Sequence, residues 1–125
     1  MSAEKPEVGS VGWVDLTVPD AEKLRDFYTA VVGWKAQGLD MGRYEDFVMA
    51  TPSGKGAAGV CHARGLNADV PPVWLVYFTV ADVVGSVAVC EANGGEVLVA
   101  PRAMGSGTFA VIRDPAGAVC ALYQS

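Results

Sequence analysis

The 125-residue chain has a net charge of −5, 51% hydrophobic residues and 18% charged residues. This length predicts one domain over 1–125, and the hydrophobic content excludes a disordered chain. The acidic charge argues against a nucleic-acid partner, which would need a basic surface to neutralise phosphates.

The N-terminal segment MSAEKPE contains no apolar stretch, so we expect no signal peptide. The three cysteines have no Cys-x-x-Cys spacing, which is typical of free thiols in a reducing compartment. Both features predict a cytoplasmic protein.

The first half of the chain predicts one strand, one helix and three further strands. Residues 11–18 are β-branched and apolar, Asp20 suits a helix N-cap, and Gly33 ends the helix. Extended segments follow at about 34–39, 43–50 and 56–62. The helix has apolar residues at helical spacing, namely Leu24, Phe27, Tyr28 and Val31.

The second half predicts the same order after a polar linker at about 64–72. The apolar segment 73–90 contains Asp82, which would cost about 2.5–3.5 kcal/mol in a membrane-spanning helix. We therefore interpret this segment as a strand followed by a helix, and expect no membrane partner. Strands follow at about 96–100, 108–113 and 118–124, with a flexible loop at about 102–107.

Matching sequences indicate that the two halves are an internal duplication. The segments Leu16–Asp20 and Phe78–Asp82 match at an offset of 62 residues, as do Gly33 and Gly95. The turns at 51–54 and 114–117 match at an offset of 63 residues. The repeat predicts module one at about 9–63 and module two at about 73–125.

Two βαβββ modules, Phe27-Tyr28 before Gly33-Trp34, and Asp114-Pro115-Ala116-Gly117 together resemble the glyoxalase, bleomycin-resistance and extradiol dioxygenase superfamily. The resemblance implies an α+β fold in which the mixed sheets of two tandem modules curl round a half-open cleft. It also implies a small-molecule ligand and a homodimer. The superfamily contains lyases, isomerases, dioxygenases, thiol transferases and non-catalytic drug binders, so the resemblance leaves the activity open.

Metal-using members of this superfamily take one ligand from the first strand of each module and a carboxylate from the last strand. The resemblance places these positions at Trp13, Leu75 and Ala121, with Ala58 or Gly59 as the fourth. None of these side chains can ligate a divalent ion. We therefore expect no metal and no other cofactor.

Two residues are candidates for acid/base catalysis. If position 13 faces the cleft, as the resemblance implies, strand alternation places Asp15 there too. Asp15 would bind a polar group of the substrate or act as a general base, or else pair with an arginine or backbone donors. His62 is the single histidine; the turn alignment favours the cleft face for it, whereas the 62-residue offset gives the opposite face.

Other residues are candidates for substrate binding. Arg64 and Arg102 would anchor an acidic group, or else lie on the surface or pair with a carboxylate. Asn67 follows Arg64 in the linker. An apolar pocket could be walled by Trp13, Tyr44, Phe47, Met49 and Tyr77, which would equally suit the core.

These residues predict a protein that binds a small, partly apolar organic molecule in a metal-independent cleft. Acid/base chemistry there would be of the lyase or isomerase type. The alternative is a non-catalytic protein that sequesters an antibiotic or metabolite. A metal-dependent lyase or dioxygenase is a lesser alternative.

Overall fold

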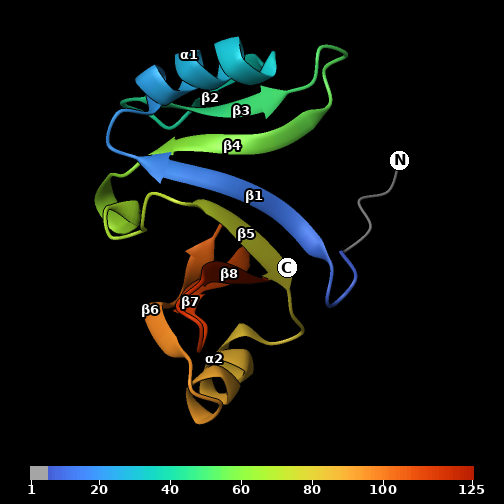
Figure 1. Ribbon diagram of the computed structural model, residues 1–125, viewed down its shortest axis with the longest axis vertical. Coiled ribbons are helices and arrows are strands. Elements are labelled where there is room, and N and C mark those ends of the chain that lie inside the picture. The colour runs from blue at the N-terminus through green and yellow to red at the C-terminus, as the bar shows by residue number, and fades with distance from the viewer. Residues whose placement is uncertain (1–5) are drawn as a thin grey trace. The chain divides into compact units, whose positions relative to one another are not determined.

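The computed structural model describes residues 6–125 (Figure 1). The N-terminal residues 1–5, which carry most of the signal-peptide expectation, lie outside this range. The elements are β1 (Val11–Val18), α1 (Ala21–Val32), β2 (Lys35–Asp40), β3 (Glu45–Ala50), β4 (Gly56–His62), β5 (Trp74–Thr79), α2 (Val83–Ala92), β6 (Glu96–Met104), β7 (Gly107–Arg113) and β8 (Val119–Gln124), with a 3-10 turn at Gly65–Asn67 in the predicted linker.

The chain divides into two compact units. The N-terminal unit is Val14–Trp74, and the C-terminal unit combines Leu75–Ser125 with the residues up to Trp13. Strand order is β2-β3-β4-β1 in the first and β6-β7-β8-β5 in the second. In each unit the two strands named last are parallel and the other neighbours are antiparallel. The α+β prediction with two βαβββ repeats is confirmed.

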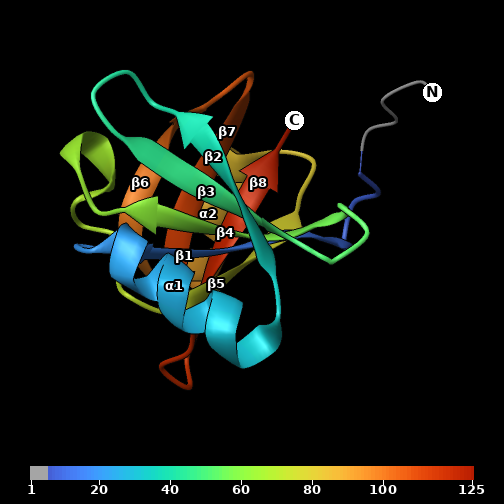
Figure 2. The ribbon, with the colours of Figure 1, turned by 90° about the horizontal axis from the view of Figure 1, so that it is seen from above.

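In the N-terminal unit, α1 packs against β2, β3 and β4 (Figures 1 and 2). The Asp20 side chain accepts a hydrogen bond from the Lys23 N–H, and Gly33 ends the helix with a φ of +84°. Such a positive φ favours glycine because it has no Cβ. The core under α1 consists of Leu16, Val18, Ala21, Phe47, Met49 and Val60, with Leu24, Tyr28, Trp34 and Trp74 packed against it.

In the C-terminal unit, α2 packs against β6, β7 and β8. Its core contains Val83, Ala110 and Leu122. The first helical N–H, on Val83, donates a hydrogen bond of 2.9 Å to Oε1 of Gln124 at the end of β8. The start of α2 is therefore tied to the last strand.

The two sequence offsets are reconciled by a β-bulge in the N-terminal unit. Met49 lies opposite Ala58, but Ala50 lies opposite Gly56, so the intervening Ala57 is an extra residue in β4. The matching pair β7 and β8 keeps one continuous register from 107–113 to 119–124. The bulge therefore returns the offset from 63 residues at the turn to 62 in the last strand.

The parallel strand pairs confirm the 62-residue offset. Asp15 lies opposite Gly59 on β4, and Tyr77 lies opposite Ala121 on β8. Gly59, rather than Ala58, is therefore the counterpart of Ala121.

The prediction that Arg102 lies in a flexible loop is wrong. Arg102 belongs to β6 and lies opposite Phe109 on β7. The strand continues through Pro101 because β6 is an edge strand of its unit and has register shifts before Arg102. Edge strands and bulges tolerate proline.

Candidate functional site

The N-terminal unit has a polar face on the side of its sheet opposite α1. Leu16, Val18 and Val60 pack toward α1, so the residues alternating with them point to the other side. The polar face consists of Asp15, Thr17, Asp46 and Cys61. Asp15 is 7% exposed and Asp46 is 5% exposed, so two carboxylates are buried on this face.

Asp46 has hydrogen-bond donors that compensate for its burial. Its Oδ1 accepts the backbone N–H of His62 at 2.8 Å and lies 3.3 Å from Nδ1 of the same residue. A buried carboxylate needs such donors because it has lost its hydration. Sequence reasoning missed Asp46, although its place opposite Cys61 follows from the strand pairing.

The Cys61 thiol is kept protonated by its surroundings. Burial raises its pKa strongly, and the carboxylates of Asp15 and Asp46 raise it further. A thiol is a nucleophile only as thiolate, so Cys61 is unsuited to covalent catalysis. Cys61 and His62 are adjacent strand residues, so alternation gives their Cβ atoms opposite faces of the sheet.

The turn-based prediction that His62 shares the face of Asp15 is wrong. His62 alternates with Val60 on β4 and therefore belongs to the face toward α1. Its ring centroid lies 5.4 Å from that of Tyr44 and 6.4 Å from that of Phe47. The bulge at Ala57 is the physical reason, since one extra residue reverses the alternation. Backbone alternation thus separates His62 from Asp15, although the His62 ring, at the end of β4, lies 3.3 Å from Oδ1 of Asp46.

Phe47 and Met49 are part of the core under α1. They are 4% and 0% exposed, and they alternate with Asp46 and Val48. The core interpretation of these two residues therefore holds over the pocket-wall interpretation.

Arg64 lies beside the aromatic ring of Tyr44. Its guanidinium carbon is 4.1 Å from the ring centroid, a cation–π contact, and Arg64 itself is exposed. Asn67 is half-buried in the 3-10 turn. A substrate-anchoring role for either residue stays a prediction.

The equivalent face of the C-terminal unit is aromatic. Phe109 lies opposite Tyr123, as Asp46 lies opposite Cys61, and Tyr77 takes the place of Asp15. The rings of Tyr77 and Phe109 are 6.4 Å apart, and the Arg102 guanidinium lies 5.4 Å from the Phe109 centroid. The aromatic face is defined by Tyr77, Phe109 and Tyr123, with Arg102 beside it. It has two aromatic rings at the positions where the polar face of the N-terminal unit has two carboxylates.

The side chains at the positions implied for metal ligands do not fit a metal. These positions hold Trp13, Leu75, Ala121 and, by the observed register, Gly59, none of which offers a suitable donor atom. Within residues 6–125, no three His, Cys, Asp or Glu side chains are grouped as a metal site would require. In the same range, neither helix is both long and apolar enough to cross a membrane.

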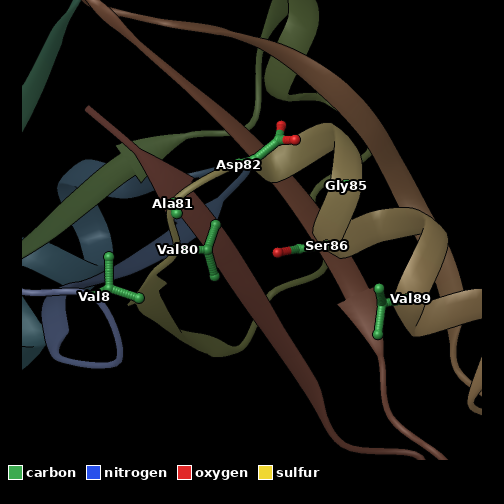
Figure 3. Close-up of a pocket in the computed structure, with 7 residues that line it drawn as sticks. All are labelled: Val8, Val80, Ala81, Asp82, Gly85, Ser86 and Val89. Carbon is green, nitrogen blue, oxygen red and sulfur yellow. The ribbon is translucent and has the colours of Figure 1, made fainter.

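An open hollow of about 500 Å³ lies beside α2 in the C-terminal unit (Figure 3). It is mostly apolar, with Asp82 and Ser86 as its polar side chains, and the lining residues are Val8, Val80, Ala81, Asp82, Gly85, Ser86 and Val89. None of the residues predicted to bind substrate lines this hollow.

Comparisons with known proteins agree with this architecture. The family model described as Glyoxalase/Bleomycin resistance protein/Dioxygenase superfamily matches residues 10–122. The anthracycline biosynthesis protein DnrV of Streptomyces peucetius is 32% identical over 129 residues, which cover 93% of this chain and 47% of DnrV. The chain therefore spans about half the length of this curated relative.

Two solved structures share the fold. Methylmalonyl-CoA epimerase of Streptomyces coelicolor, in complex with 2-nitronate-propionyl-CoA, has a TM-score of 0.55 at 19% identity, with 95% of this chain and 99% of that chain covered. A glyoxalase/bleomycin resistance protein/dioxygenase superfamily member from Vibrio splendidus has a TM-score of 0.58 at 13% identity, with 90% and 97% covered.

Proposed function

The chain belongs to the Glyoxalase/Bleomycin resistance protein/Dioxygenase superfamily, and we propose that it binds a small, partly apolar organic molecule without a metal ion and transfers a proton on it. The reaction class is proton transfer next to a carbonyl or an elimination, as in an isomerase or lyase. The support for metal independence is the set of apolar side chains at the implied ligand positions.

The observation that carries the proposal is the buried carboxylate of Asp15. A strand interior rarely contains aspartate. Asp15 is only 7% exposed on the polar face, and it lies on β1 opposite Gly59 of the bulged strand β4. A carboxylate held in a protein site can accept a proton from a carbon next to a carbonyl group. Asp15 is therefore the proposed general base, and His62 at the end of β4, whose ring reaches the polar-face residue Asp46, is proposed as the second acid/base group.

The proposed ligand class follows from the relatives and the aromatic face. DnrV is named for anthracycline biosynthesis, and the structural neighbour holds a CoA ester. Both compound classes carry carbonyl groups. Within the C-terminal unit, the aromatic face offers the Tyr77 ring to an apolar group and the Arg102 guanidinium to an acidic group.

Two probes and a matched pair of variants test the proposal. Metal-free protein is incubated in D₂O with an anthracycline or with methylmalonyl-CoA, and deuterium uptake into the probe is measured by mass spectrometry. We expect uptake with one probe, lost in Asp15→Asn and retained in Glu22→Gln, an exposed carboxylate on α1. Uptake that is unchanged in Asp15→Asn would overturn the role of Asp15.

A non-catalytic sequestering protein is the second candidate function. The net charge of −5 and the aromatic face favour it, since together they suit a cationic aromatic ligand. It predicts saturable binding of an anthracycline that weakens with added salt, and recovery of the unchanged compound after long incubation. Recovery of an altered compound would contradict it.

We also propose that the chain works as a homodimer in the cytoplasm. DnrV has about twice the length covered by this chain, so two copies of the chain would match its length. Light scattering coupled to gel filtration should give twice the mass of one chain, and a mass of one chain would contradict the dimer.

A further inference from the structure

We infer that Asp46 is a positioning residue that holds the His62 ring with Nδ1 protonated and leaves Nε2 as a proton acceptor. This inference rests on the proposed acid/base function. An ionised carboxylate only accepts hydrogen bonds, so the proton shared between Oδ1 and Nδ1, 3.3 Å apart, belongs to the imidazole when Asp46 is charged. A neutral imidazole with Nδ1–H has its lone pair on Nε2.

A second bond fixes the carboxylate itself. Oδ1 of Asp46 also accepts the backbone N–H of His62 at 2.8 Å. Asp46 thus holds both the main chain and the ring of the same residue, and the side chains are 7% and 13% exposed. Within residues 6–125, the hydrogen bond of the His62 ring is made through Nδ1. A carboxylate that accepts a hydrogen bond from one ring nitrogen orients the histidine in many metal and hydrolytic sites.

The equivalent position in the C-terminal unit shows that this pair is not a requirement of the fold. By the 62-residue offset, the counterpart of His62 is Gln124, whose side chain accepts the N–H of Val83 at the start of α2. In the N-terminal unit, Asp20 caps α1 instead. The residue at the end of β4 therefore does not cap a helix. His62 stands there and contacts the buried carboxylate of Asp46 instead.

The neighbouring rings restrict how the imidazole can turn. Tyr44 packs against it with an interplanar angle of 76°, and Phe47 lies beside it in the core. Within residues 6–125, Arg64 makes a cation–π contact with the Tyr44 ring and is not ion-paired with Asp46. Among the described residues, the Asp46 carboxylate is thus the anionic group that contacts the His62 ring.

The tautomer is directly measurable because the chain has one histidine. Long-range ¹⁵N–¹H correlation spectra of uniformly labelled full-length protein, recorded at a pH where the imidazole is neutral, distinguish Nδ1–H from Nε2–H. We expect the Nδ1–H form in the wild type. Predominance of Nε2–H in the wild type would overturn the inference without any variant.

Two variants separate the hydrogen bond from the charge. Asp46→Asn keeps an acceptor oxygen for both N–H groups and should retain the Nδ1–H form, whereas Asp46→Ala removes the acceptor and should populate Nε2–H. An unchanged tautomer in a folded Asp46→Ala protein would contradict the inference. If that variant does not fold, the wild-type spectrum and Asp46→Asn still decide.

Deuterium uptake separates this inference from the proposed function. With a probe that exchanges, Asp46→Ala should lower kcat by about tenfold to a hundredfold at unchanged KM, whereas Asp46→Asn, which keeps the acceptor and the Nδ1–H form, should lower kcat less. If the wild type has the Nδ1–H form but no probe takes up deuterium, the proposed reaction would be overturned. The inferred hydrogen bond from Nδ1 to Asp46 would still stand. Full kcat in both Asp46 variants would overturn the positioning role.

Discussion

The two units have the same strand order and the same pairing between their parallel strands, yet they place different chemistry at equivalent positions. The N-terminal unit has Asp15 and Asp46 on its polar face, where the C-terminal unit has Tyr77 and Phe109. The backbone pattern is thus independent of these side chains. The fold is shared between the halves, whereas the chemistry depends on individual substitutions on it.

The two helices differ in a related way. α1 covers an aromatic cluster in which the indole N–H of Trp74 donates to the Tyr28 hydroxyl at 3.1 Å. α2 is apolar on several sides and leaves Val84 and Val89 65% and 61% exposed. α1 likewise leaves Phe27 and Val31 exposed, so the two helices differ in the aromatic cluster rather than in the exposure of apolar side chains.

The test with the largest expected effect on activity substitutes the residue at one equivalent position in each unit. Asp15→Asn should lower deuterium uptake by about 10²–10⁴-fold, the usual contribution of a general base. Tyr77→Phe removes a hydroxyl but keeps the ring, so a loss of about tenfold or less is expected. Equal losses, measured by mass spectrometry on the same probe, would contradict the assignment of the base to the N-terminal unit.

Removing a core side chain should have the largest effect on stability. Met49→Ala creates a cavity under α1 and should lower the free energy of unfolding by about 2–5 kcal/mol. Val89→Ala on the exposed side of α2 should change it by less than about 0.5 kcal/mol. Urea denaturation measures both, and a similar cost would show that the exposed face of α2 is covered in solution.

The Cys61 thiol gives a pH test of the polar face. Its pKa is raised in the folded protein, so the unfolded chain loses the thiol proton first as pH rises. The stability linked to this group is complete below about pH 8.5, the ordinary thiol value, and falls above it by about 1.4 kcal/mol per pH unit.

The matching control is Cys61→Ala, whose unfolding free energy should fall less steeply above about pH 8.5 than that of the wild type. Alkylation at pH 8 should likewise be slow at Cys61 in the folded protein. Rapid alkylation of native Cys61, located by mass spectrometry, would show that the polar face is accessible.

The helix caps give the smallest expected difference. Asp20→Ala removes the side-chain acceptor of the Lys23 N–H and should cost about 0.5–2 kcal/mol. Asp82→Ala should cost less, because Asp82 makes no side-chain cap bond and Gln124 takes that role. Thermal unfolding of the two variants checks the order, and a larger cost at Asp82 would reverse the account of capping.

The sequence patterns predicted the two repeats and the caps of α1, because these depend on local periodicity and on glycine and aspartate chemistry. The face of His62 was not predictable from the turn alone, since a single bulge residue, Ala57, reverses it.

The site was harder to predict than the fold. The environment of Asp46 depends on pairing between β3 and β4, which brings together residues 16 positions apart. Nothing in the local sequence distinguishes Asp46 from a surface aspartate. Arg102 was misplaced because an edge strand with bulges resembles a loop when only proline and glycine are counted.

Metal content per chain tests most directly the claim that carboxylates and rings, rather than metal ligands, provide the chemistry of the two faces. Protein purified without chelator would be offered zinc, nickel, manganese and iron, desalted and measured by inductively coupled plasma mass spectrometry. The account predicts retained metal near zero for every ion. Occupancy near one ion per chain would contradict it and would favour a metal-dependent lyase or dioxygenase.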